Sequence, residues 1–276
     1  ETRALVLPNG EMLRQEGALG LSLVRMTAEA ATAVPTSGEP VDLISLSAVQ
    51  LKGRLGGDPR AIHTLRLQIR GVRPDQVWDG PPLQSVSGDE VTISMPMLLE
   101  LPRLPVADTS DPQWLVTTPT IPAGHLELVQ KAEEVIGDAD SRLEAVKRLN
   151  EFVYTYVEKV PSMGVPNGLT VLRSARGDCN EHTALFVSLA RAADIPARIA
   201  AGVVYSDRVG EHGAFYYHAW PEVLLGGPTE WVPVDPTFGQ VPADATHVKL
   251  VEGDLDRQIE IMGVMGKLGF TLIEAR

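Results

Sequence analysis

Cysteine is almost missing from this sequence, whose 276 residues include a single copy, Cys179. One thiol excludes an internal disulfide, and it excludes the zinc sites that are built from paired cysteines. Long apolar runs are missing as well, so we expect no membrane-spanning segment. Lysine and arginine form no cluster, and the net charge is −12. We therefore expect no nucleic-acid partner.

These absences leave the location of the protein open. Many exported proteins have no disulfide, and the sequence, which begins at Glu1, shows no signal-peptide pattern. Cytoplasmic and exported locations both stay open, and so does the oligomeric state. The apolar fraction of 44% and the charged fraction of 22% are ordinary for a globular protein. The length fits one large domain or two smaller ones.

The first part of the chain has the alternating pattern of half-buried β-strands. Apolar and polar residues alternate in Leu65–Arg70 and in Val91–Met95, and Leu43–Leu51 is a further predicted strand. No catalytic group of residues stands out among these segments. We predict that residues 1–118 form a mostly β accessory domain, and strands of this domain can also lie before Glu1.

A proline-rich stretch over residues 100–123 separates this region from the rest of the chain. Proline at this density disfavours helix, so we place the domain boundary here and assign residues 119–276 to a second, catalytic domain. That domain opens with two predicted amphipathic helices, His125–Ile136 and Asp140–Glu158. Val160–Leu172 is predicted to be a connecting loop.

The lone cysteine stands where a buried helix is predicted to begin. Asp178 is a good N-cap, and Glu181 completes a capping box with it. Cys179 is then the first helical residue, at the positive end of the helix dipole, where a thiolate is favoured. The helix is apolar on nearly all sides over residues 184–190, which indicates burial. A lone cysteine can also be a small buried apolar residue with no chemical role.

A histidine and a carboxylate are predicted to meet on a β-hairpin around Gly226-Gly227. His218 lies in the first strand of the hairpin, and Asp235 ends the second. If Leu225 pairs with Pro228 across the turn, His218 faces Asp235 directly, with Cβ atoms roughly 5 Å apart. An imidazole held by a carboxylate can take a proton from a thiol and return it to a leaving group. A structural histidine–aspartate pair on the sheet is the alternative.

Three segments carry one pattern in the order cysteine, histidine, aspartate: Gly177-Asp178-Cys179-Asn180-Glu181-His182, His218-Ala219-Trp220-Pro221-Glu222-Val223 and Trp231-Val232-Pro233-Val234-Asp235-Pro236-Thr237. Together they resemble the transglutaminase-like superfamily of bacterial type, a branch of the papain-like cysteine enzymes. The resemblance spans about residues 121–250. It implies an α+β fold in which the cysteine helix packs on an antiparallel sheet. It also implies that Cys179 is the nucleophile, His218 the base and Asp235 the residue that orients the imidazole.

The resemblance suggests roles for three further residues. Family members often hold the oxyanion with a side chain that precedes the cysteine, and Asn167 is the nearby amide available for this role. Trp220 can wall the acyl site, although a place in the core is the simpler interpretation. Residues 244–250 resemble the closing part of bacterial members, where His247 is expected to be structural.

The residues point to an enzyme that attacks an amide bond and forms a thioester at Cys179. With water as the acceptor it is a cysteine peptidase or amidase, which we favour, and its substrate is a protein or peptide. With an amine as the acceptor it is a protein-glutamine transglutaminase. Deglycosylation, as in the peptide N-glycanases, conflicts with the lack of paired cysteines. The sequence predicts no cofactor.

Two alternatives fall outside this class. The first is a binding or assembly module that keeps the fold without catalysis, although the complete set of Cys179, His218 and Asp235 argues against it. The second is a metal site built from Cys179, His182 and His218, for which a fourth ligand is missing. We therefore predict no metal.

Overall fold

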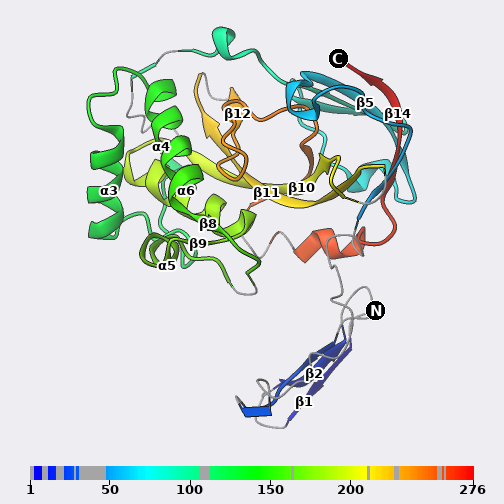
Figure 1. Ribbon diagram of the computed structural model, residues 1–276, viewed down its shortest axis with the longest axis horizontal. Helices are drawn as coiled ribbons and strands as arrows, with labels where there is room; N and C mark the ends of the chain where they lie inside the picture. Colours follow the sequence, from blue (N-terminus) through cyan, green and yellow to red (C-terminus); the bar gives the residue numbers. More distant parts are fainter. Residues whose placement is uncertain are drawn as a thin grey trace.

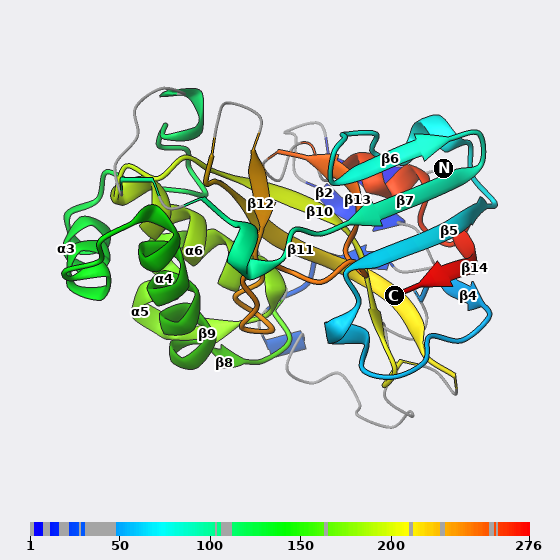
Figure 2. The ribbon, with the colours of Figure 1, turned by 90° about the horizontal axis from the view of Figure 1, so that it is seen from above.

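The computed structural model describes residues 3–7, 12–16, 22–27, 29–30, 48–102, 104–105, 112–162, 165–209, 212–226, 230–253, 257 and 259–276. The predicted α+β fold class is confirmed, because a group of helices packs on an antiparallel sheet. Figure 2 shows the helices gathered at one end of the molecule and a second sheet at the other. Strands β10 (Ala197–Ser206) and β11 (Ala214–Leu224) run between these two ends.

Both predicted amphipathic helices are present. Helix α3 spans Leu126–Ile136, and α4 spans Arg142–Tyr156 with Ser141 as its N-cap. The segment predicted as a connecting loop, Val160–Leu172, instead contains the start of a helix, α5 (Gly168–Ser174). The side chain of Asn167 caps this helix by accepting a hydrogen bond from a first-turn amide. Glycine and asparagine at a helix start had suggested a loop, but both are common there.

The cysteine helix α6 (Cys179–Ala192) lies at the centre of the helical group. Its side chains from Glu181 to Arg191 are all buried, as the apolar run predicted. It contacts α3, α4 and α5 on one side and β11 on the other. The shared core includes fully buried residues from each of these elements, among them Leu128, Leu149, Val171, Phe186 and Val223. This packing fixes the head of α6 relative to the sheet.

The central sheet has four strands in the order β12-β11-β10-β13. Strand β12 spans Trp231–Pro233 and β13 spans Val248–Glu252. The predicted hairpin of β11 and β12 forms, but its predicted register is wrong: Leu224 pairs with Trp231, and Val223 pairs with Val232. The connection between the two strands is longer than a two-residue turn, so the pairing slides by two positions. Residues 227–229 lie outside the described residues.

A five-stranded sheet in the order β4-β14-β5-β7-β6 covers the other end. Two of its strands match the predicted alternating segments, β5 (Thr64–Arg70) and β7 (Glu90–Ser94), and β6 spans Gln84–Ser87. Strand β14 (Gly269–Ala275) comes from the C-terminal end and lies between β4 (Gln50–Lys52) and β5. Residues 43–47 of the strand predicted over Leu43–Leu51 lie outside the described residues.

The five-stranded sheet and the central sheet share one core. Its buried residues include Leu65, Leu67 and Ile93 of the first sheet, and Val203, Phe215 and Val248 of the second. The proposed division into residues 1–118 and 119–276 therefore runs through a packed interface, and β14 crosses it. The division itself stays a prediction.

The remaining elements are short. Strands β1 (Arg3–Val6), β2 (Met12–Glu16) and β3 (Ser22–Val24) form a three-stranded sheet that lies apart from the rest of the molecule in Figure 1. Strands β8 (Glu158–Lys159) and β9 (Arg176–Gly177) pair in parallel before α6. The 3₁₀-helices are η2 (Pro59–Ala61), η3 (Pro74–Gln76), η4 (Leu98–Glu100), η5 (Pro112–Trp114) and η6 (Ile259–Gly263). Within the described residues, none of the helices combines the length and the apolar character that crossing a membrane requires.

Candidate active site

Cys179 is the first residue of α6, as predicted, and the capping box in front of it forms. The Asp178 carboxylate accepts a hydrogen bond of 3.0 Å from the Asn180 amide. The Glu181 carboxylate accepts one of 3.0 Å from the Asp178 amide. The thiol therefore lies at the positive end of a helix dipole. Cys179 is partly exposed, so a substrate can reach it.

Two further side chains surround this helix start. Burial and the neighbouring Glu181 carboxylate raise the pKa of Asp178 to about 6. His182, one turn into α6, is fully buried, and its Nδ1 atom lies 2.6 Å from the Asp178 carbonyl oxygen. Burial lowers the pKa of His182, so its imidazole is neutral at pH 7. His182 is thus a helix residue held by its own backbone. Cys179, His182 and His218 are not among the described residues whose ligand atoms gather closely enough to hold a metal together.

His218 lies in β11, and its Nε2 atom is 2.8 Å from Oδ2 of Asp235. The predicted contact is present although the predicted register is wrong. Strand β12 ends at Pro233, and the Val234 amide extends its pairing with β11 by one more hydrogen bond, to the Pro221 carbonyl oxygen. Asp235 then turns back and forms an isolated bridge with Gln240. This turn brings the carboxylate to the imidazole.

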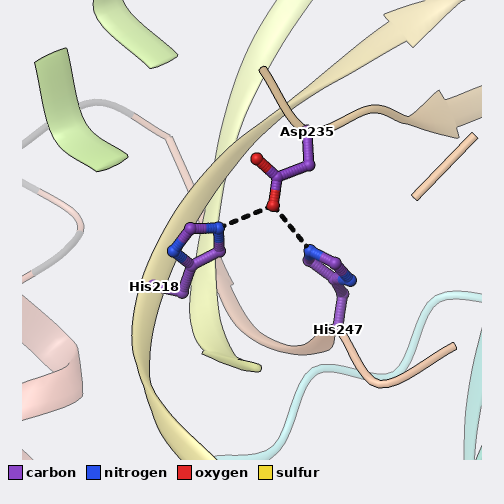
Figure 3. A group of neighbouring side chains, drawn as sticks. All are labelled: His218, Asp235 and His247. Carbon is purple, nitrogen blue, oxygen red and sulfur yellow. Dashed lines mark hydrogen bonds and ion pairs between the residues drawn. The ribbon is translucent and has the colours of Figure 1, made fainter. Parts of the chain in front are cut away.

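Asp235 is fixed by its own turn. Its Oδ1 atom accepts hydrogen bonds from the amides of Thr237 at 2.6 Å and Phe238 at 3.0 Å. Because Oδ1 is committed to the turn, Oδ2 faces the sheet, where Figure 3 shows it between two imidazole rings. Asp235 is completely buried. Burial raises its pKa, but His218 and His247 outweigh this effect and hold the pKa well below its usual value.

The other nitrogen of His218 is available to the thiol. Nδ1 is buried, and it makes no hydrogen bond of normal geometry in the described part of the chain. Burial lowers the pKa of His218, but Asp235 and the nearby Cys179 outweigh burial and raise it to about 9. His218 is therefore an imidazolium at pH 7 when Cys179 is a thiolate.

Cys179 and His218 line one cavity of about 170 Å³. Its other lining residues come from α6, from the middle of β10 and β11 and from the C-terminal segment: Asn180, Ala201, Gly202, Tyr217, Ala219, Ile261 and Met265. The buried hydroxyl of Tyr217 has no hydrogen-bond partner among the described residues. The cavity thus combines apolar lining residues with four polar ones: Cys179, Asn180, Tyr217 and His218.

Aromatic rings enclose His218. Phe238 stacks on its imidazole with centroids 5.1 Å apart, and Trp220 lies 6.1 Å away at an interplanar angle of 21°. Tyr216 meets the ring with its edge at 5.9 Å. Trp220 is buried and is not among the cavity-lining residues, so its place is beside the imidazole in the core. The rings keep water from the His218–Asp235 hydrogen bond and hold the imidazole in one plane.

Residues 129–236 match the sequence profile described as the Transglutaminase-like superfamily. This part of the chain is a transglutaminase-like superfamily domain. Cys179, His218 and Asp235 all fall inside the matched segment of this domain. No curated protein sequence matches the chain.

Several solved structures resemble the chain at low identity. A candidate cysteine protease from Cytophaga hutchinsonii has 13% identity and a TM-score of 0.44, covering 83% of this chain and 85% of its own. The ethylmercury-bound periplasmic domain of TgpA from Pseudomonas aeruginosa has 17% identity and a TM-score of 0.40. The match covers 72% of this chain and 93% of the TgpA domain. Red sea bream transglutaminase has 11% identity and a TM-score of 0.34. The match covers 68% of this chain and 49% of the transglutaminase chain. These scores carry no argument about activity.

The structure does not bring Asn167 to the site of the transglutaminase-like domain. Its Oδ1 atom accepts a hydrogen bond from the Thr170 amide at 3.0 Å, and its Nδ2 atom donates to the Pro119 carbonyl oxygen at 2.7 Å. Both polar atoms of the side chain are committed to starting α5, and Asn167 does not line the cavity. The expectation that Asn167 holds the oxyanion is therefore wrong.

His247 is the residue that sequence reasoning underrated. It comes from beyond the matched segment, and its Nε2 atom lies 3.0 Å from the same Asp235 oxygen that His218 contacts. The sequence offered one signal, a histidine inside the motif at residues 244–250, but nothing in it showed which carboxylate this histidine would meet. Three residues place possible ligand atoms within 4.8 Å of one another: His218, Asp235 and His247. The short distances from Oδ2 to both rings are those of N–H···O hydrogen bonds, so these donors are already used.

Proposed function

We propose that this protein is a thiol-dependent acyl-transfer enzyme that cleaves amide bonds in a protein or peptide substrate through a thioester at Cys179. In this proposal His218 is the general acid and base, Asp235 orients it, and water is the acceptor, which makes the enzyme a cysteine peptidase or amidase. One observation supports the proposal above the others. Nδ1 of His218 is unoccupied beside Cys179 while Nε2 is bound to a buried carboxylate.

The first half-reaction forms the thioester. The Cys179 thiolate attacks the amide carbonyl carbon, a C–S bond forms, and the carbonyl oxygen becomes an oxyanion. The positive end of the α6 dipole stabilises this negative charge. The C–N bond then breaks, and the leaving amine takes the proton from Nδ1 of His218. His218 is left neutral, with Nε2–H still bound to Asp235.

The second half-reaction releases the acyl group. Neutral His218 takes a proton on Nδ1 from the acceptor, which attacks the thioester carbonyl. The C–S bond breaks, and the thiolate–imidazolium pair returns.

The proposed mechanism does not require a short distance between the Cys179 thiol and the His218 imidazole before a substrate binds. Hydrogen bonds between catalytic groups are often loose before a substrate binds and tighten in the complex. Cys179 and His218 line the same cavity, so a bound substrate can bring the two groups together.

The pH dependence of Cys179 alkylation by iodoacetamide tests the proposal. In the wild type we expect alkylation at pH values well below the ~8.5 pKa of a free thiol. In His218→Ala this reaction at low pH should vanish, because no imidazolium stabilises the thiolate. His63→Gln is the matched control, since His63 is exposed and lies outside the site. The same profile in wild type and His218→Ala would contradict the proposal and favour a binding module.

A second experiment identifies the acceptor. The protein is incubated with a pool of peptide amides, and mass spectrometry follows the mass of Cys179 and of the peptides. Acyl-Cys179 and hydrolysed peptide are expected. Hydrolysis should persist when the primary amine dansylcadaverine is added. If the amine is incorporated instead, the acceptor is an amine and the enzyme is a transglutaminase.

A further inference from the structure

We propose that His247 is a positioning residue for this reaction: an imidazole that stays protonated at neutral pH, shares the Asp235 carboxylate with His218 and keeps it ionised when His218 gives up its proton. This inference rests on the proposed function. It assigns a role to a residue outside the matched family segment, and it connects the β region to the reacting groups.

Both ring nitrogens of His247 face only hydrogen-bond acceptors. Nε2 lies 3.0 Å from Asp235 Oδ2, and Nδ1 lies 3.0 Å from the Asp244 carbonyl oxygen. Nδ1 is also 3.7 Å from the Asp244 carboxylate. A neutral imidazole carries one N–H and would leave one of these acceptors facing a lone pair, so the contacts require a proton on both nitrogens. The side chain is completely buried, and no water competes for it.

The surroundings of His247 favour its cationic form. Burial lowers its pKa, but Asp244 and Asp235 raise it to about 9. The charged and titratable groups that face it are Asp244 from the preceding turn, Asp235 from the segment after β12 and His218 from β11. Two aromatic rings cover its sides, Trp220 at 5.1 Å and Phe238 at 6.2 Å between centroids.

Asp244 is itself held in place from the β region. Its Oδ1 atom accepts hydrogen bonds from the amide and hydroxyl of Thr246, at 2.8 and 2.5 Å. Its Oδ2 atom lies 2.9 Å from Nη1 of Arg60, which belongs to η2. The Arg60 guanidinium also donates to the Tyr205 carbonyl oxygen and lies 4.7 Å from the centre of the Phe238 ring. Phe238 in turn stacks on His218. Arg60 of η2 therefore supports His247 through Asp244, and His218 through Phe238.

Charges therefore alternate along a chain of direct contacts from Arg60 through Asp244, His247 and Asp235 to His218, and His218 lines one cavity with Cys179. The side chain of Arg60 at one end is 28% exposed, while those of the other four residues of this chain are at most 2% exposed. If His218 were the only cation beside the buried Asp235 carboxylate, Asp235 would be left as an unpaired buried charge whenever His218 lost its proton, which costs free energy. His247 removes this cost, because Asp235 keeps one imidazolium throughout the cycle.

The arrangement also adjusts the acidity of His218. Both rings contact the same oxygen, and their centroids are 5.7 Å apart. Two imidazolium ions at this distance repel each other, so His247 makes the His218 proton easier to release than Asp235 alone would allow. A general acid works best when its pKa lies near the working pH. The carboxylate shared with His247 thus orients His218 without raising the pKa of His218 as far as an unshared carboxylate would.

The variant His247→Gln tests this role. Glutamine keeps one N–H for Asp235 but has no charge. The alkylation profile of Cys179 has an alkaline step, where His218 loses its proton beside the thiolate. We expect this step to move to higher pH by about one to two units, the size of a unit-charge interaction at this separation near a protein surface. His63→Gln is the control and should keep the wild-type profile.

The outcomes separate the two proposals. If the wild type has no thiolate reactive at low pH, the proposed function fails and the role of His247 fails with it. If the wild type behaves as proposed and the alkaline step of His247→Gln stays in place, only the role of His247 is overturned. A merely structural histidine would lower stability without moving this step.

A measurement on the wild type keeps the inference testable if His247→Gln does not fold. In protein labelled with ¹⁵N-histidine, NMR resolves the protonation of each ring nitrogen. We expect both Nδ1 and Nε2 of His247 to be protonated at pH 7.5. A neutral His247 at this pH would overturn the inference whatever the reactivity of Cys179.

Discussion

Gly202 lies directly opposite His218 in the pairing of β10 with β11. On its other side Gly202 pairs with Lys249 of β13, next to a shift in register. A Cβ atom at residue 202 would collide with the Val248 carbonyl oxygen and would lie 3.0 Å from both the Leu250 amide nitrogen and the Lys249 Cα atom. These are backbone atoms that cannot rotate away. The glycine therefore lets β13, which begins directly after His247, approach the strand behind His218.

We expect Gly202→Ala to push β13 away from β10 and to displace His247. Overpacking of this kind costs about 1–3 kcal/mol of unfolding free energy. Urea unfolding measures this loss, and the rate of Cys179 alkylation at pH 6.5 should fall in the same protein. Gly56→Ala is the matched control, because nothing lies within 4 Å of a Cβ atom there. Wild-type stability in Gly202→Ala would contradict the close approach.

Asp235→Asn should disable the site and destabilise the fold together. Asp235 accepts two amide hydrogen bonds on Oδ1 and two imidazole hydrogen bonds on Oδ2. Asparagine has one oxygen, so in either orientation its NH₂ group faces two donors. Breaking a buried charge pair costs about 3–5 kcal/mol. Cys179 alkylation at pH 6.5 should fall roughly tenfold or more, because each unit lost from the His218 pKa is tenfold. Asp207→Asn, on an exposed turn, is the control.

The helices and the order of the reacting residues could be predicted from the sequence because their signals are local. The capping box at Asp178 and the apolar run behind it placed Cys179 correctly at a helix start. The contact between His218 and Asp235 was also expected, but for an incorrect reason. The hairpin register slides by two positions, and Asp235 reaches the imidazole through a turn after the strand ends.

The parts that the sequence did not reveal depend on contacts between distant segments. The family resemblance suggested Asn167 as an oxyanion ligand, yet both polar atoms of its side chain make hydrogen bonds at the start of α5. His247 meets Asp235 only because β13 packs on β10. Arg60 reaches Asp244 across 184 residues of sequence. No periodicity or spacing encodes such contacts, which follow from how the two sheets share a core.

Asp178→Asn should stabilise the protein above pH 6. The folded pKa of Asp178 is about 6, above its ordinary 3.8. A raised carboxyl pKa means that the folded state holds the proton more tightly, so stability falls as pH rises from 3.8 to 6. Asparagine is as good an N-cap and has no charge to repel Glu181. After a discount for solvent screening at this partly exposed group, we expect about 1 kcal/mol at pH 8.

Thermal unfolding at pH 4 and pH 8 checks this expectation. The difference between Asp178→Asn and wild type should be present at pH 8 and nearly absent at pH 4. Asp178→Ala removes the cap as well as the charge, so it should be less stable than Asp178→Asn at both pH values. Equal gains at both pH values would show that the charge of Asp178 is not the cause.

The buried charge network predicts a window of pH in which it stabilises the fold most. His218 and His247 have folded pKa values of about 9, above the ordinary 6.5, so their contribution is complete below 6.5 and disappears as pH rises through 9. Asp235 and Asp244 have pKa values below the ordinary 3.8, so their contribution is complete above 3.8 and disappears in stronger acid. Both contributions are complete between pH 3.8 and 6.5.

The alkaline side of this window is the cleaner test, because Asp178 no longer titrates there. Urea unfolding of the wild type at pH 6.5, 8 and 9.5 should show a steady loss of unfolding free energy. The double variant Asp244→Asn/His247→Gln removes one carboxylate and one imidazolium together, so the net charge of the network is unchanged. The cation that loses its partner, Arg60, is 28% exposed and can turn to solvent. The double variant should therefore lose less unfolding free energy over the same range. In the double variant, the remaining decrease of unfolding free energy with pH then comes from His218. Parallel losses in both proteins would mean that His247 is neutral in the folded state, and the alternating charges from Arg60 to His218 would end at Asp235.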